Sequence, residues 1–140
     1  MSQPWAGKTV LIVDDSPTVR TYLTGMYEKL GFTVSGIASN GIEALREFEK
    51  KRPDLVSLDI VMPEMNGIEC LFNLKDRDPS VTFVLVSVLA GDAGTIKQFA
   101  EVIPAYCFIS KPATREKLEA SLIQVFAANT AAKVTDKIAS

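Results

Sequence analysis

Histidine is absent from the 140 residues of this chain. A Ser-His-Asp triad, a histidine-ligated zinc site and a phosphohistidine therefore cannot be formed by this chain alone. Any histidine that takes part in its chemistry must come from a partner. Cysteine is scarce too: Cys70 and Cys107 have neither CxxC spacing nor the density of a disulfide scaffold. We expect both thiols to be reduced and packed in the core.

Long hydrophobic runs and an excess of positive charge are also missing. No apolar run approaches the ~20 residues of a membrane span, and the first residues, MSQPWAGK, include no apolar stretch of signal-peptide length. We therefore expect a cytoplasmic protein without membrane insertion. The formal net charge of -2 provides no general attraction for nucleic acid, so direct binding to it is not expected.

The pattern of the chain is that of alternating strands and helices. With 140 residues, 47% of them hydrophobic, the chain has the size and composition of one globular domain. Apolar runs of strand length alternate with segments of helical period, which predicts an α/β fold with a parallel sheet covered on both faces. The predicted strands are 9–13, 32–37, 55–58, 82–86 and 106–109. The predicted helices are 17–30, 41–52, one that carries Ile68, Leu71 and Leu74, 93–102, and 114–126.

Several helix ends are marked by specific residues. Ser16-Pro17 is an N-cap residue followed by the imino acid that the first helical position tolerates, and Gly31 is a stop signal. Asn40 with Glu43 three residues later resembles a capping box. After Ala127 the sequence has no clear apolar stripe, so we expect a frayed terminus there.

Polar residues stand at the point where four of the predicted strands end. Asp14-Asp15 follow TVLIV, Asp59 follows LVSL, Ser87 follows FVLV, and Lys111-Pro112 follow YCFIS. In an open α/β sheet, ligands bind outside the carboxyl ends of the strands. If these strands are neighbours, three carboxylates, a hydroxyl and an ammonium meet in one crevice.

Such a crevice suits a hard cation and a phosphoryl group. At ~4 Å and an effective dielectric near 20, each pair of carboxylates repels by up to about 4 kcal/mol, so the acidic cluster requires a cation. Oxygen ligands without nitrogen or sulfur favour Mg²⁺. The ammonium of Lys111 and the hydroxyl of Ser87 could hold phosphoryl oxygens, and an Asp carboxylate can act as the nucleophile. Asp59, central in strand order, is the candidate.

The ordered set LIVDDSPTVR, SLDIVMPEMNGIE, VLVS and FISKP resembles a response-regulator receiver domain of the stand-alone chemotaxis type. The resemblance covers a receiver domain at residues 8–127, leaving an N-terminal extension (1–7) and a C-terminal tail (128–140). It implies a single-domain, flavodoxin-like, doubly wound (βα)5 fold whose five parallel strands have the order 2-1-3-4-5. It also implies that the Lys111-Pro112 bond is cis.

The same resemblance implies a role for each residue of the crevice. Asp59 would accept the phosphoryl group from the phosphohistidine of a sensor histidine kinase or a histidine phosphotransfer protein. Ser87 and Lys111 would contact that group, and Ser87 and Phe108 would act as the switch. Phosphorylation would then change the surface of the fourth helix, fifth strand and fifth helix, to which a protein target binds. Mg²⁺ would be held by Asp15, Asp59 and the main-chain carbonyl of Val61, with Asp14 acting mainly through a bound water.

Other functions remain open at this point. The chain could be a relay intermediate or phosphate sink that passes the phosphoryl group to a histidine phosphotransfer protein or to water. In either case it catalyses only its own phosphorylation and dephosphorylation. A phosphatase with an Asp nucleophile is disfavoured because Val61, two residues beyond Asp59, is not a second carboxylate. Val61 and Leu89 are both apolar at positions that modulate water access in this family, and this predicts a long-lived aspartyl phosphate.

Overall fold

The computed structural model describes residues 3–62, 67–88, 94, 97 and 103–139. Its five strands form one parallel sheet with the order β2-β1-β3-β4-β5, as predicted. The strands are β1 (Thr9–Val13), β2 (Thr33–Ala38), β3 (Leu55–Leu58), β4 (Thr82–Ser87) and β5 (Phe108–Ser110). The helices are α1 (Pro17–Leu30), α2 (Gly41–Lys51), α3 (Gly67–Arg77) and α5 (Arg115–Ala139), with a 3₁₀ turn, η1 (Ala105–Cys107).

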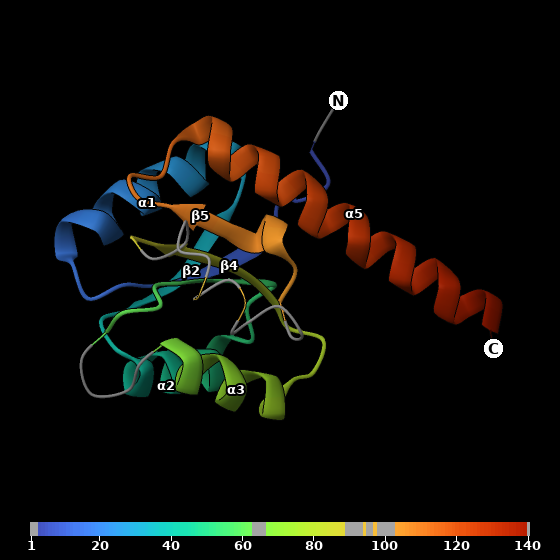
Figure 1. Ribbon diagram of the computed structural model, residues 1–140, viewed down its shortest axis with the longest axis horizontal. Coiled ribbons are helices and arrows are strands. Elements are labelled where there is room, and N and C mark those ends of the chain that lie inside the picture. Colours follow the sequence, from blue (N-terminus) through green and yellow to red (C-terminus); the bar gives the residue numbers. More distant parts are fainter. Residues whose placement is uncertain (1–2, 63–66, 89–93, 95–96, 98–102, 140) are drawn as a thin grey trace.

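The helices cover both faces of the sheet. Figure 1 shows α1 and α5 on one face and α2 and α3 on the other. Every residue of β3, and all but the first residue of β1 and of β4, is buried, as expected for strands packed between two layers. Cys70 and Cys107 are free and buried, as the sequence predicts. None of the described helices is long and apolar enough to span a membrane.

Side chains fix the ends of the first two helices. The Ser16 hydroxyl accepts the Val19 N–H at 3.3 Å, Pro17 begins α1, and Gly31 ends it with φ 106°. The Asn40 side chain accepts the Glu43 N–H at 2.9 Å, so half of the predicted capping box is present. The other half differs, because Glu43 accepts the N–H and hydroxyl of Ser39 rather than returning to Asn40.

The boundary of the fifth strand also differs from the sequence prediction. The fifth strand begins at Phe108 rather than at 106, because Ala105–Cys107 form the turn η1. Cys107 and Ile109 are buried, while Tyr106, Phe108 and Ser110 are partly exposed. The predicted helix at 93–102 lies mostly outside the described residues.

The prediction of a frayed terminus after Ala127 is wrong. α5 continues as one helix from Arg115 to Ala139, and Figure 1 shows its C-terminal half extending beyond the sheet. The prediction relied on the missing apolar stripe, whereas helix propensity favours this segment: AANTAAKVTDKIA is rich in alanine and contains neither glycine nor proline.

One residue of the N-terminal extension, Trp5, packs against the amino edge of the sheet. Trp5 is fully buried, and its indole N–H donates to the Leu30 carbonyl at 2.8 Å. Its ring stacks on Phe32 with centroids 6.4 Å apart. We call Trp5, Tyr27, Phe32 and Phe126 the aromatic cluster, since their rings contact one another. Trp5 of the extension is therefore part of the core.

Candidate phosphoacceptor site

Asp14 directly follows β1, and both its main chain and its side chain are hydrogen-bonded. Its N–H donates to the Ala38 carbonyl at 3.0 Å, and its Oδ1 accepts the Ser16 N–H at 2.9 Å. The side chain is only 1% exposed. Asp15, the next residue, is exposed at the rim. The paired aspartates thus divide into one buried and one solvent-facing carboxylate.

Asp59 stands at the end of β3, beside β1. Its N–H donates to the Val13 carbonyl at 2.9 Å, which aligns the ends of the two strands. Its Oδ1 accepts the Val61 N–H at 3.2 Å, and the residue is 5% exposed. Carboxylate oxygens of Asp14, Asp15 and Asp59 lie within 4.8 Å of one another. We call these three residues the acidic cluster.

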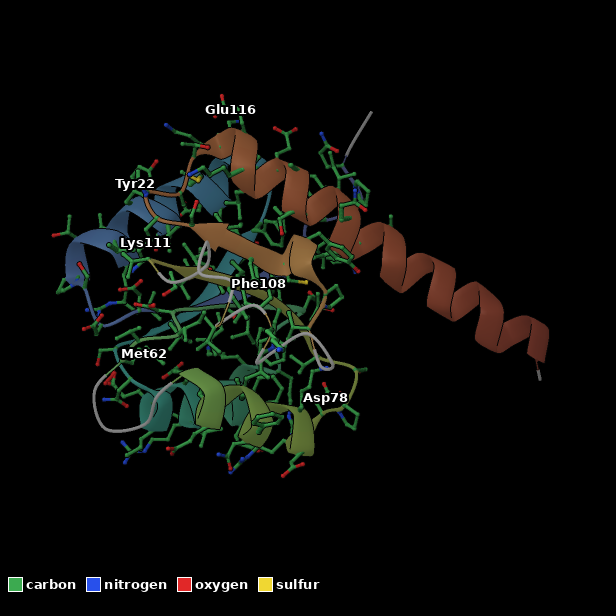
Figure 2. All side chains as sticks on the ribbon, in the orientation of Figure 1. Tyr22, Met62, Asp78, Phe108, Lys111 and Glu116 are labelled. Carbon is green, nitrogen blue, oxygen red and sulfur yellow. The ribbon has the colours of Figure 1, made fainter. Side chains whose placement is uncertain are left out.

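Lys111 reaches the acidic cluster from the opposite side of the crevice. It follows β5 (Figure 2), and its N–H donates to the Ser87 carbonyl at 3.1 Å, continuing the pairing of β4 and β5. Its Nζ lies 2.7 Å from Oδ2 of Asp14 and 3.2 Å from Oδ2 of Asp59. The Lys111-Pro112 bond is cis, as predicted. One ammonium therefore bridges two carboxylates that stand 45 residues apart in the sequence.

The pKa values of the bridged groups move for different reasons. Burial raises the pKa of Asp59 above its ordinary value, although the Lys111 ammonium and the Val61 N–H act in the opposite direction. Burial alone would lower the pKa of Lys111, but the nearby carboxylates of Asp14 and Asp59 together outweigh it and raise that pKa. Lys111 therefore remains an ammonium in the crevice at neutral pH.

The acidic cluster fits a divalent cation. Three carboxylates and one ammonium leave two negative charges, which a divalent ion would balance. The side-chain atoms that could bind an ion are all oxygens, which a hard ion such as Mg²⁺ prefers over nitrogen or sulfur. Val61, whose main-chain carbonyl the family resemblance implies as a further ligand, is 51% exposed and stands at the rim.

Ser87 and Phe108 occupy neighbouring strands near this crevice. Ser87 is the last residue of β4 and is fully buried; it pairs with Ser110 of β5. Phe108 begins β5 and is partly exposed. It lines a groove of about 400 Å³ between β5 and α5, together with Tyr106 and Gln124. Leu89, which the sequence analysis singled out beside Val61, lies outside the described residues.

One residue that shapes the site received no role in the sequence analysis. A Cβ on Gly67, the first residue of α3, would lie 2.5 Å from the Asp59 carbonyl oxygen and 2.5 Å from the Ile60 Cα. Only glycine allows the helix to begin so close to the strand end, where the Gly67 N–H donates to the Ile60 carbonyl at 2.8 Å. The Asn66-Gly67 pair in the sequence was the available signal.

Comparison with known proteins agrees with this geometry. Residues 10–123 match the family model of the response regulator receiver domain. This chain belongs to that family. As a receiver of the chemotaxis type it is 40% identical over 106 residues to the chemotaxis protein CheY of Thermotoga maritima, a match that covers 76% of this chain and 87% of the relative.

Longer proteins and solved structures are similar to the same receiver domain. A protein-glutamate methylesterase/protein-glutamine glutaminase of Hahella chejuensis is 44% identical over 93 residues, which are 66% of this chain and only 27% of that protein. A chain of the CheX-CheY-BeF3-Mg²⁺ complex from Borrelia burgdorferi superposes with a TM-score of 0.79 at 33% identity. That match covers 86% of this receiver and 90% of the Borrelia chain.

Proposed function

We propose that this receiver is a phosphorylation-controlled switch of a cytoplasmic two-component system, with Asp59 as the phosphoacceptor. The donor would be the phosphohistidine of a sensor histidine kinase or of a histidine phosphotransfer protein. The observation that carries the proposal is the placement of Lys111 Nζ between Asp14 and Asp59, at 2.7 and 3.2 Å, in a rim that gathers three carboxylates. The absence of histidine from the chain agrees with a donor histidine on a partner.

The transfer step uses the carboxylate of Asp59 as nucleophile. One of its oxygens attacks phosphorus, the P–N bond to the donor imidazole breaks, and the released imidazole takes a proton from solvent. Asp14, Asp15, Asp59 and the Val61 carbonyl would hold Mg²⁺, which supplies positive charge for the phosphoryl oxygens when bound. Lys111 would exchange its contact with Asp59 for one with a phosphoryl oxygen, since both are anionic acceptors.

The output would be a change of the surface formed by the fourth helix, β5 and α5. A phosphoryl group adds about −1.5 to −2 charges and three acceptor oxygens at the ends of β3 and β4. Ser87 would turn its hydroxyl toward this group, and Phe108 would change its packing in response. The position of Phe108 supports this role, because it lies in the groove between β5 and α5 and in the strand that leads to Lys111.

The proposal is tested by incubating the purified chain with Mg²⁺ and a small phosphodonor and measuring its mass. We expect one added phosphoryl group, none in Asp59→Asn, and an unchanged result in the matched variant Asp54→Asn, an exposed aspartate before β3. Phosphorylation of Asp59→Asn to the wild-type level would overturn the assignment.

The switch role is tested separately with beryllofluoride, which mimics the phosphoryl group. Proteins captured only by the treated receiver would identify its targets. Rapid passage of the phosphoryl group from Asp59 to a histidine phosphotransfer protein, with no protein captured in either state, would instead support a relay or phosphate sink.

A further inference from the structure

Tyr22 joins α1 to the segment that follows Lys111. Its hydroxyl donates to the Ala113 carbonyl at 2.7 Å, although the two residues stand 91 positions apart in the sequence. Ala113 is buried and lies two residues beyond Lys111. Figure 2 shows Tyr22 and Lys111 at the same edge of the molecule. One hydrogen bond therefore connects the first helix to the segment that carries the ammonium of the crevice.

Packing on the α1 side supports this segment poorly. A cleft of about 630 Å³ lies between α1 and the segment, and it is lined by Lys111, Pro112 and Ala113 together with Val19 and Tyr22 of α1. Atoms beside an unfilled space lose the dispersion contacts that a close-packed interior provides. The position of the segment therefore depends more strongly on its hydrogen bonds than it would in a filled core.

Two hydrogen bonds hold the main chain on either side of the Lys111 side chain. On the β4 side, the Lys111 N–H donates to the Ser87 carbonyl at 3.1 Å. On the α1 side, the Tyr22 hydroxyl holds the Ala113 carbonyl. The direction in which the Lys111 side chain leaves the main chain is therefore set from β4 and from α1 together.

The bond from Tyr22 restrains the segment better than the bond from Lys117. The Lys117 ammonium donates to the Pro112 carbonyl at 3.2 Å, but Lys117 is exposed and its four-carbon stem is flexible. A tyrosine has a rigid ring and only two side-chain torsions, so it loses little entropy when its hydroxyl is held in place. Tyr22 therefore restrains the main chain next to Lys111 at a low entropic cost.

The position of the Lys111 ammonium matters for the transfer step. Its Nζ lies 3.2 Å from Oδ2 of Asp59 and, under the proposed function, moves to an oxygen of the incoming phosphoryl group. A displacement of about 1 Å in a reacting site can lower the rate by up to about 10²-fold. The carboxylates of the acidic cluster follow β1 and β3, whereas the Tyr22 bond acts on the segment after β5. Losing that bond should therefore disturb the ammonium and leave the metal ligands in place.

We propose that Tyr22 is a positioning residue of the phosphoacceptor site. Its hydroxyl fixes the Ala113 carbonyl and thereby holds the Lys111 ammonium beside Asp59. This role rests on the proposed function, since it requires Lys111 to contact the transferred group. Without the hydroxyl, the ammonium should stay in the crevice but sample more positions, so phosphorylation should slow while Mg²⁺ binding remains as in the wild type.

Phosphorylation kinetics test this role. The full chain is incubated with phosphoramidate over a range of Mg²⁺ concentrations, and the phosphoryl group added to Asp59 is followed by intact mass. Tyr22→Phe should lower the maximal rate roughly fivefold, as expected for one hydrogen bond, and should leave the Mg²⁺ concentration for half-maximal rate unchanged. Thr24→Val is the matched control, because it also removes a hydroxyl–carbonyl bond of 2.7 Å from α1, but one that ends on the Arg20 carbonyl within the helix. The control should keep the wild-type rate.

The amide signals of the ¹⁵N-labelled chain test the same role without phosphorylation. The Ala113 carbonyl and the Thr114 N–H belong to one peptide group, so Tyr22→Phe should shift the Thr114 signal. It should also shift the Lys111 signal, because the segment between them moves. Thr24→Val should shift neither.

The role of Tyr22 would be overturned, with the proposed function intact, by a wild-type rate in Tyr22→Phe or by an equal loss of rate in Thr24→Val. A raised Mg²⁺ requirement at an unchanged maximal rate, or signals of Lys111 and Thr114 that do not move, would overturn it as well. A wild type that accepts no phosphoryl group would overturn the proposed function and this role together.

Discussion

At the amino edge of the sheet, Trp5 stacks on Phe32 in a dry aromatic cluster, whereas at the carboxyl edge three carboxylates surround one ammonium. The first arrangement removes apolar surface from water and satisfies the indole N–H with the Leu30 carbonyl. The second confines like charges that repel one another. The comparison teaches that the aromatic cluster stabilises the fold of this receiver, whereas repulsion within the acidic cluster destabilises it as long as no ligand is bound. Such a cost is common at functional sites.

The largest expected effect lies at the amino edge. Trp5→Ala should lower the free energy of unfolding by about 3–5 kcal/mol, because it leaves a cavity among buried rings. Urea denaturation measures this loss. Phosphorylation of Asp59 should persist under conditions where the variant is still folded. The exposed residue Phe72, truncated to Ala, is the matched control, and an equal loss there would mean that Trp5 has no special role.

A smaller loss is expected at the carboxyl edge from Lys111→Met. This variant leaves the buried Asp14 without its ammonium at 2.7 Å, which should cost about 2–3 kcal/mol in urea denaturation at neutral pH. The folded pKa of Lys111 is raised, so its contribution is complete below its unfolded pKa near 10.4 and is lost only as the pH rises through the folded value.

The difference between wild type and Lys111→Met should therefore hold at neutral pH and shrink in strongly alkaline solution. A stability difference that grows above pH 10 would contradict the ion pairing. Lys117→Met, which removes an amine from the exposed first turns of α5, serves as the control.

The lifetime of the phosphorylated form should differ between the wild type and a variant with a polar residue in place of Val61. Val61 stands exposed at the rim and cannot orient a water molecule toward the phosphoryl group. We expect the label on purified phosphoprotein to decay over minutes or longer, and Val61→Gln to shorten its half-life about tenfold, equivalent to 1.4 kcal/mol. Val88→Gln, also at an exposed valine of the rim, is a control for general polarity. Decay of the wild type within seconds would refute this prediction.

The smallest expected effects on the free energy of unfolding are those of Asp14→Asn and Asp15→Asn, and they should have opposite signs. In EDTA, Asp15→Asn should raise the free energy of unfolding by about 1 kcal/mol, because it removes repulsion from the acidic cluster without touching the pair to Lys111. Asp14→Asn should lower it, because the buried carboxylate is bonded to Lys111 and to the Ser16 N–H.

Mg²⁺ should stabilise the wild type and stabilise each of these variants less. Thermal unfolding with and without Mg²⁺ measures all three differences. Identical melting of the wild type in EDTA and in Mg²⁺ would argue against a metal site at the acidic cluster.

The sequence predicted what periodicity and strand-end chemistry determine. The five strands follow from buried runs that stop at polar residues, and the caps at Ser16 and Asn40 follow from local capping residues. The meeting of Asp14, Asp59 and Lys111 also needs the strand order, which the receiver resemblance implied. These features are local or are fixed by the order of strands in a parallel sheet.

Other features depend on contacts between distant segments and could not be predicted in this way. Trp5 belongs to the core only because Phe32 and Phe126 meet it at the amino edge. The close approach of Gly67 to Asp59 is a property of tertiary packing. The extension of α5 was not predicted because the segment after Ala127 has no clear apolar stripe, and only its alanine content favours a helix.

The burial of Trp5 has a practical consequence, because Trp5 is the only tryptophan of the chain. Its indole lies at the edge of the sheet opposite the acidic cluster. Its fluorescence emission should therefore not change when a metal ion or a phosphoryl group binds, and should change when the aromatic cluster becomes exposed to water. Intrinsic fluorescence is therefore a clean reporter of global unfolding in this protein, while events at Asp59 require a probe placed near the rim.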